Sequence, residues 1–159
     1  MQDPVDQILK QWGDVKPGLD CSDMGIVGRL MRVQGLWHSQ LEHVFKQHQL
    51  SMLEFDILAT LMRNKQPLTP TEMYKTLMIS SGAMSTRIEK LVQRGLVKRL
   101  TSGDDRRSCK VTLTQLGAQL VDEALASHLS NMNGMLSIFN EQEKAQLADM
   151  MRKILLAKQ

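Results

Sequence analysis

Cysteine and long apolar runs are scarce in this sequence, and each shortage argues against a class of protein. The two cysteines, Cys21 and Cys109, form no CxxC pair or ligand cluster, so a disulfide-stabilised secreted domain is not indicated. No apolar run approaches the ~20 residues that span a bilayer. The N-terminus also lacks the basic and then apolar stretch of a signal peptide. We therefore expect a cytoplasmic protein with no membrane partner.

Motifs that carry enzyme chemistry are also missing. The sequence has no Gly-rich phosphate loop, no metal-ligand motif and no nucleophile with a plausible base. His38, His43 and His48 are spaced by five residues. On a helix this spacing rotates each imidazole by about 140° from the last, so the three cannot surround one metal. We expect neither enzymatic activity nor a bound metal or cofactor.

Residues 69–114 hold the most informative pattern of the chain. Thr69 and Glu72 form a capping box with Pro70 at the first helical position, which predicts the start of a short helix. A second helix is expected after it, with apolar positions every three to four residues. These positions are Met84, Ile88 and Leu91.

A two-stranded ribbon is predicted to follow. Gly95 lies after the last apolar helical position, where a left-handed residue ends a helix. Residues 96–100 and 109–113 are typical of strands, and residues 101–105 have turn chemistry. The order helix, turn, helix, hairpin is that of a winged helix-turn-helix. The predicted fold class is therefore mainly α with a small β-hairpin.

Basic side chains concentrate on this unit. Residues 87–110 contain eight basic and three acidic residues, a net charge of +5, whereas the whole chain carries +3. Clustered Lys and Arg neutralise DNA phosphates. Short hydroxyl side chains allow a helix close approach to the major groove, and an arginine at a hairpin tip suits a narrow minor groove. The residues predicted to contact double-stranded DNA are Ser80, Ser81, Ser85, Thr86, Arg87, Lys90, Arg99, Asp105, Arg106 and Arg107.

Amphipathic helices are predicted on both sides of the winged unit. Their apolar surface exceeds what the winged unit can cover, which favours self-association. Two copies whose recognition helices lie about 34 Å apart would match an inverted repeat in DNA. We expect an N-terminal extension with a short extra helix (1–20) and a single domain (21–159). Within that domain we expect the winged helix-turn-helix at 51–114 and dimerisation helices at 22–50 and 115–159.

These residues resemble the MarR family of bacterial transcriptional regulators. The match is carried by the wing Asp105-Arg106-Arg107, by Val111-Thr112-Leu113-Thr114 with Gly117, and by Arg94-Gly95-Leu96. The resemblance implies a dimeric winged helix-turn-helix protein, usually a repressor that a small aromatic or anionic ligand releases from DNA. It also implies that Asp105 braces the wing and that Arg107 enters the minor groove.

A narrower resemblance is to the PecS-type, urate-responsive branch of that family. It implies ligand contacts at Trp12, Asp56, Ser85 and Arg87. Trp12 would stack on a purine ring and Arg87 would neutralise its anionic edge. We hypothesise that Asp56 holds Arg87 when the ligand is absent. The alternative for Trp12 is a hydrophobic peg that docks its helix.

Three other functions stay open. A regulator of the same class could answer phenolic carboxylates or other drugs through a methionine-rich pocket. A redox sensor could use Cys21 or Cys109, since Cys109 has basic neighbours. An architectural protein would bind DNA without preferring an operator sequence.

Overall fold

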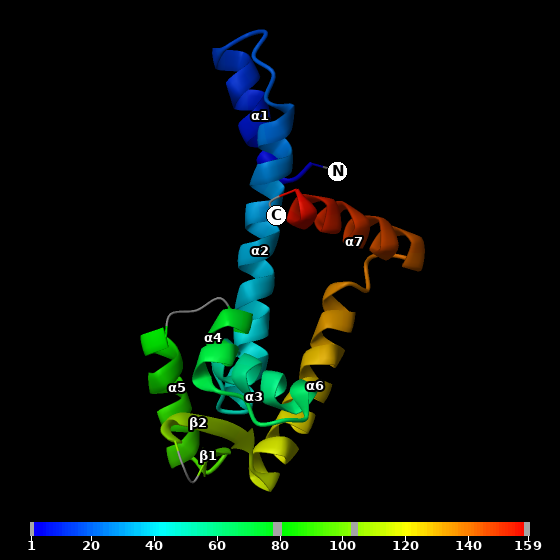
Figure 1. Ribbon diagram of the computed structural model, residues 1–159. Helices are drawn as coiled ribbons and strands as arrows, with labels where there is room; N and C mark the ends of the chain where they lie inside the picture. Colours follow the sequence, from blue (N-terminus) through cyan, green and yellow to red (C-terminus); the bar gives the residue numbers. More distant parts are fainter. Residues whose placement is uncertain (1, 78–80, 103–104, 158–159) are drawn as a thin grey trace. The chain divides into compact units, whose positions relative to one another are not determined.

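The structure, a computed structural model, describes residues 2–77, 81–102 and 105–157, and it leaves the side chains of residues 81, 101, 102 and 105–108 undescribed. It divides into two compact units, residues 1–40 and 41–159. The predicted fold class is confirmed. The elements (Figure 1) are α1 (Pro4–Val15), α2 (Ser22–Gln47), α3 (Met52–Asn64), α4 (Pro70–Leu77), α5 (Ser81–Gln93), β1 (Val97–Ser102), β2 (Asp105–Leu113), α6 (Gln115–Met135) and α7 (Glu141–Leu156).

The first unit pairs α1 with the beginning of α2. Asp3 and Asp6 form the capping box that starts α1. Val5 is buried against Gly28, where an added Cβ would lie 3.6 Å from the valine side chain. Arg29 of α2 reaches back to α1, with its Nε 2.7 Å from Asp3 and its Nη2 2.5 Å from Asp6. Leu9 likewise packs at Gly25, so ion pairs and apolar contacts together hold this helix pair.

The core of the second unit lies where α3, α4, α5 and the hairpin meet. The predicted apolar stripe of α5 is confirmed, because Met84, Ile88 and Leu91 are at most 1% exposed. The capping box predicted for Thr69 and Glu72 at the start of α4 also forms, and Ser51 and Glu54 form another at the start of α3. Other fully buried side chains of this core are Ile57, Leu58, Thr60, Met73, Val97, Val111 and Val121.

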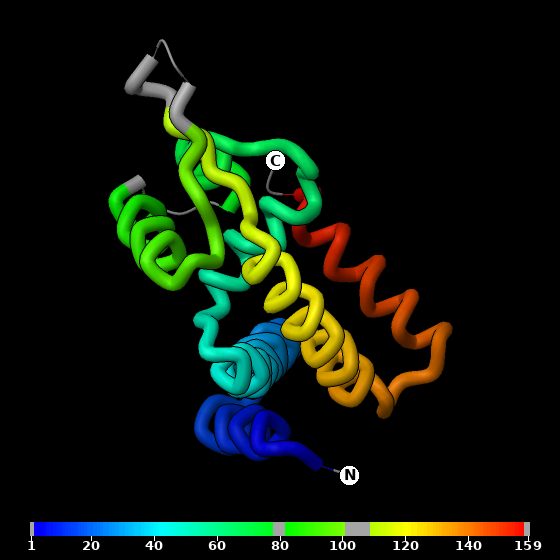
Figure 2. The backbone as a smooth tube through the Cα atoms, turned by 90° about the horizontal axis from the view of Figure 1, so that it is seen from below, coloured from blue at the N-terminus to red at the C-terminus, as the bar shows by residue number. Residues whose placement is uncertain are grey.

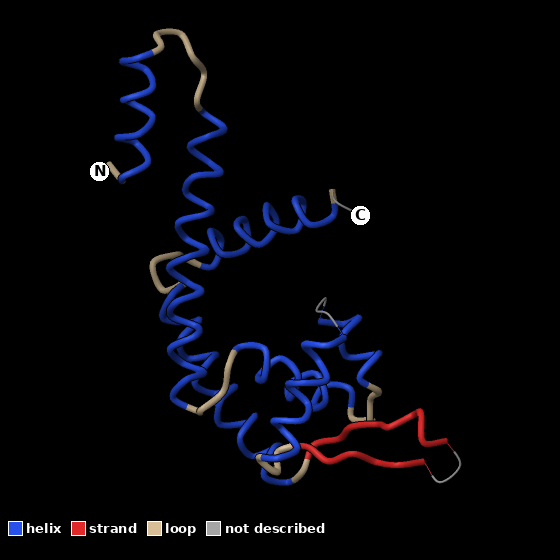
Figure 3. The backbone as a smooth tube through the Cα atoms, turned by 90° about the vertical axis from the view of Figure 1, so that its left-hand side faces the viewer, coloured by secondary structure: helices blue, strands red, loops and turns tan. Residues whose placement is uncertain are grey.

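The strands pair in antiparallel fashion and reach further toward the tip than predicted (Figure 3). Ser102 pairs with Asp105, both within the stretch expected to form the turn, and a register shift beside Leu100 accommodates them. A short third edge was not predicted. Leu68 exchanges two backbone hydrogen bonds with Val111, of 3.0 and 2.7 Å. The connection before α4 is therefore fastened to the hairpin.

The base of the hairpin is joined to α6 (Figure 2). Thr114 caps α6 by accepting a bond from the backbone N–H of Gly117, and its hydroxyl donates to the carbonyl of Gly95 at 2.7 Å. Gly95 has the predicted left-handed backbone, with φ +68°. A Cβ at Gly117 would lie 1.9 Å from the Leu96 carbonyl oxygen. Glycine is therefore required where α6 passes the hairpin.

The last helix packs loosely. Asn140 and Glu143 form its capping box, and α7 begins at Glu141. None of its described residues is buried. Among the described helices, none combines the length and apolar character needed to cross a membrane.

Candidate nucleic-acid interface

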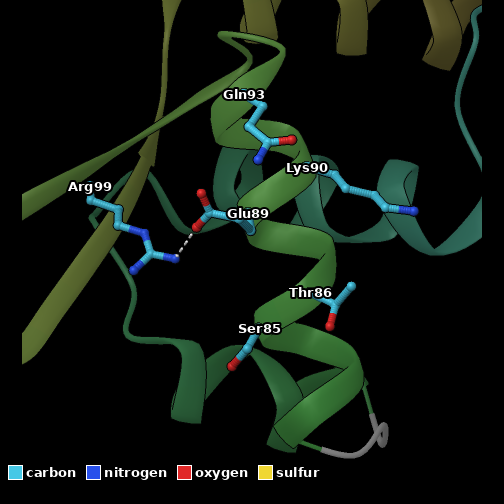
Figure 4. A pocket seen from close by; sticks show the side chains of 6 residues that line it. All are labelled: Ser85, Thr86, Glu89, Lys90, Gln93 and Arg99. Atoms are coloured by element: carbon cyan, nitrogen blue, oxygen red, sulfur yellow. Dashed lines mark hydrogen bonds and ion pairs between the residues drawn. The ribbon is translucent and has the colours of Figure 1, made fainter.

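The exposed face of α5 lies beside β1 and forms a polar surface. Ser85, Thr86 and Lys90, all predicted DNA contacts, are exposed on it. Met84, Ile88 and Leu91 bury the opposite face of α5, so packing fixes which side chains point outward. A hollow of about 500 Å³ is lined by Ser85, Thr86, Glu89, Lys90, Gln93 and Arg99 (Figure 4).

Charges on this surface are arranged unevenly. Arg99 of β1 donates to Glu89 of α5 at 2.8 Å, which links the strand to the helix. Figure 4 shows Lys90 pointing away from this pair, and Lys90 makes no ion pair within the described part of the chain. Hydroxyl, amide and ammonium groups on one face are suited to base edges and phosphates.

Arg87 lies at the edge of the buried face rather than with these exposed side chains. Its Nη1 is 3.8 Å from Oε1 of Glu54, and Nη1 of Arg94 is 3.8 Å from Oε2 of the same carboxylate. Glu54 belongs to α3 and is only 7% exposed. Arg94, which follows the end of α5 and is exposed, also pairs with this buried carboxylate.

The remaining predicted DNA contacts lie wholly or partly outside the description. Ser80 is among the residues that the structure does not describe, and the side chains of Ser81, Asp105, Arg106 and Arg107 are likewise undescribed. The backbone of residues 105–107 belongs to β2. Their contacts with DNA therefore stay predictions.

The residues predicted to bind a ligand belong to different units. Trp12 lies on α1 in the first unit and is 39% exposed. In the second unit, the hypothesised bridge between Asp56 and Arg87 is wrong, because the ion pair of Arg87 is with Glu54. Residues two apart on a helix point about 200° away from each other. Asp56 therefore points to another side of α3 than Glu54 does.

Asp56 instead interacts electrostatically with His128, a histidine in an aromatic cluster. The ring of His128 on α6 lies 5.0 Å from Phe45 and 5.5 Å from Phe55. Burial lowers the pKa of His128, which the charge of Asp56 partly offsets. Burial raises the pKa of Asp56, although its side chain is partly open to solvent, and the charges of Arg63 and His128 oppose this shift. Burial therefore sets the direction of both pKa shifts, and the interaction between the two groups opposes each of them.

The two cysteines are free thiols of intermediate exposure. The Sγ atom of Cys109 lies 3.9 Å from the carbonyl oxygen of Lys110. Within the described ranges, no group of three or more His, Cys, Asp or Glu side chains is placed to hold a metal ion. Neither cysteine therefore has a chemical partner that points to a metal or disulfide role.

Comparison with known proteins agrees with this geometry. A family model described as "MarR family" matches residues 48–108, which include α3 and the helix-turn-helix. The HTH-type transcriptional regulator PecS of Dickeya dadantii is 36% identical over 94% of this chain and 92% of its own length. The chain belongs to the MarR family.

Solved structures of MarR-type proteins have the same fold. A variant of MarR from E. coli in complex with operator DNA is 23% identical, has a TM-score of 0.71 and is matched over 91% of this chain and 97% of that chain. An organohalide-sensing regulator, RdhR, in its 2,4-dichlorophenol-bound form is 18% identical, with a TM-score of 0.74 and coverage of 86% and 80%. The winged helix-turn-helix of this MarR-family chain is thus shown by sequence and by fold.

Sequence reasoning did not find three residues of this MarR-type interface. Glu89 and Gln93 lie one and two turns beyond Ser85 and Thr86 on the exposed face of α5, so helical spacing alone could have found them. For Glu54 the sequence offered only a local pattern, which did not reveal its arginine partners. Its capping role is visible in the sequence, whereas its arginine partners lie more than 30 residues further along the chain.

Proposed function

We propose that this MarR-family chain is a DNA-binding transcriptional repressor that binds an inverted-repeat operator as a homodimer. We further propose that a small aromatic anion, with urate as the candidate, weakens DNA binding. The observation that carries the proposal is the exposed polar face of α5. It presents Ser85, Thr86 and Lys90 beside a basic hairpin.

The chemistry of this face suits double-stranded DNA. Lys90 supplies a cation without a competing carboxylate in the described part of the chain, and the hydroxyls of Ser85 and Thr86 are short enough for close approach to bases. The MarR variant with the same fold was solved with operator DNA. These features support reading of the major groove by α5.

A second copy of the chain is the proposed cover for the exposed apolar side chains. In the second unit α7 buries no described residue, and Ile138, Ile154 and Leu155 are between 52% and 78% exposed. In the first unit Ile26, Met31 and Leu36 are between 64% and 68% exposed. Exposed apolar surface of this extent marks an association surface. A two-fold axis would also provide two recognition helices for an inverted repeat.

The effector proposal rests on residue chemistry. The relative RdhR was solved with an aromatic ligand, 2,4-dichlorophenol, and this chain is 36% identical to PecS. In this chain the Arg87 side chain on α5 is partly exposed beside Glu54, and Trp12, which belongs to the other unit, has an exposed indole on α1. Guanidinium and indole groups are suited to the charge and the ring of a small aromatic anion.

DNA selection tests the main proposal. The wild-type protein would be used to select duplexes from a random-sequence library, and binding would be measured by fluorescence anisotropy at several salt concentrations. We expect an inverted repeat bound at least about 10³-fold more tightly than a scrambled duplex, with affinity falling steeply as salt rises. Equal affinity for both duplexes would indicate an architectural protein instead.

Calorimetry tests the effector. Urate would be titrated into the wild type and into Trp12→Ala, and salicylate would serve as the competing ligand class. We expect heat with urate for the wild type and weaker binding for the variant. Heat with salicylate alone would favour the phenolic carboxylates, and no heat with either compound would remove both claims.

A further inference from the structure

We propose that Glu54 is a positioning residue for DNA recognition, whose buried carboxylate holds α5 in place through Arg87 and Arg94. Among the described residues Glu54 is the only charged residue that is buried. A buried carboxylate is costly unless cations and hydrogen bonds compensate it. The residues that pair with Glu54 therefore indicate which structural role its buried charge has.

One carboxylate pairs with Arg87 within the recognition helix α5 and with Arg94 directly after its last residue. Oε1 of Glu54 lies 3.8 Å from Arg87 and Oε2 lies 3.8 Å from Arg94. Positions seven residues apart fall on the same edge of a helix. The two arginines therefore meet Glu54 as a pair, and rotating α5 about its axis would break both contacts together.

The other side of the carboxylate is fixed to the start of α3. Oε2 of Glu54 accepts the backbone N–H of Ser51 at 2.8 Å and its hydroxyl at 3.0 Å. These bonds hold the carboxylate to a helix that contributes much of the core. Glu54 thereby connects a rigid helix to the helix that reads DNA.

The basic residues in and directly after α5 differ in role, because Arg87 and Arg94 pair with Glu54. If Arg87 or Arg94 left to bind a phosphate, Glu54 would remain buried with fewer compensating partners. The two arginines therefore stay paired with Glu54 and fix the position of α5. Contact with bases and phosphates falls to the exposed side chains Ser85, Thr86 and Lys90.

The chain offers matched controls for this role. Glu72 and Glu143 occupy the same capping-box position in α4 and α7, and they accept the backbone N–H of Thr69 at 2.7 Å and of Asn140 at 2.8 Å. Neither pairs with an arginine within the described residues. The same Glu→Gln change at these sites removes a charge and perturbs a helix cap without breaking an ion pair to an arginine.

The test compares Glu54→Gln with Glu72→Gln and Glu143→Gln. Each protein would be measured by anisotropy on a duplex selected by the wild type and on a scrambled duplex, after thermal unfolding confirms that it folds. We expect Glu54→Gln to lower the ratio of the two affinities about tenfold. The freed arginines should also steepen the salt dependence on the scrambled duplex by about one to two counterions. Both controls should keep the ratio within about twofold.

A milder pair of variants covers the case in which Glu54→Gln does not fold. Arg94→Gln removes one of the two arginine partners of Glu54, and Lys98→Gln removes an exposed charge of the neighbouring strand. We expect Arg94→Gln to lower the ratio, and Lys98→Gln to weaken both duplexes alike. The inference rests on the proposed DNA binding, and a wild type that prefers no duplex would overturn both. A wild type that does prefer one, beside a folded Glu54→Gln or Arg94→Gln with an unchanged ratio, would overturn the role of Glu54 alone.

Discussion

Gly117 occupies the tightest place between the hairpin and α6, since an added Cβ would lie 1.9 Å from the Leu96 carbonyl oxygen. Backbone rather than a flexible side chain stands in the way, so Gly117→Ala must shift α6 or the hairpin. We expect a loss of about 2 kcal/mol or more in the free energy of unfolding, measured by chemical denaturation.

Gly134 provides the control in the same helix. A Cβ there would meet nothing within 4 Å. Gly134→Ala should therefore be neutral or stabilising by up to about 1 kcal/mol, because alanine has the higher helix propensity. Equal destabilisation by the two variants would show that the close approach to Leu96 does not matter.

Replacing Lys90 tests whether a single exposed charge on α5 contacts a DNA phosphate. Lys90→Ala should weaken binding to selected and scrambled duplexes alike and reduce the salt slope by about one. Lys153→Ala, an exposed charge on α7, should leave both unchanged. If Lys90→Ala changed the preferred sequence instead of the slope, Lys90 would be a base contact and not a phosphate contact.

At the scale of elements, the cluster that joins α2, α3 and α6 should be sensitive to acid. Burial among Phe45 and Phe55 lowers the pKa of His128 in the folded state. The unfolded chain, with a histidine pKa of about 6.5, then binds the proton more tightly. Stability contributed by the neutral ring is present above about pH 6.5 and is lost as pH falls toward the lowered folded value.

Denaturation at several pH values checks this sign. The free energy of unfolding should fall between about pH 7 and pH 5 in the wild type and fall less in His128→Gln. Asp56 acts in the opposite direction and at lower pH, because its raised pKa favours the folded state once its carboxyl is protonated. His43→Gln, on an exposed part of α2, should behave as the wild type. An identical pH profile for His128→Gln would contradict the assignment.

Elements that depend on neighbouring residues were predictable, and contacts between distant residues were not. Capping boxes such as that of Thr69 and Glu72 involve residues three apart, so the sequence displays them directly. The bridge of Leu68 to Val111 depends on how α4 packs, and no local pattern marks it. The exposed face of α5 followed from helical spacing. The partner of Arg87 was wrongly expected to be Asp56, because Glu54 lies on another helix and no local pattern marks the pair.

At the scale of the whole molecule, the apolar surface of α7 predicts dependence on a second copy. Leu155 is 70% exposed, and Leu155→Glu would place a charge in the proposed interface, which is costly to bury. We expect light scattering to show a monomer and the affinity for an inverted-repeat duplex to fall about 100-fold or more.

The exposed polar residue Gln146 lies on the same helix and gives the control. Gln146→Glu adds the same charge and should stay dimeric with unchanged DNA binding. A Leu155→Glu monomer that still bound the duplex with wild-type affinity would separate dimerisation from recognition.

The fastening of the hairpin at two places limits how it can travel. Thr114 joins the base of the hairpin to the first turn of α6. Leu68, in the connection before α4, is hydrogen-bonded to the edge of the hairpin. Because the base of the hairpin is bonded to the first turn of α6, a rotation of α6 would carry the described part of both strands with it.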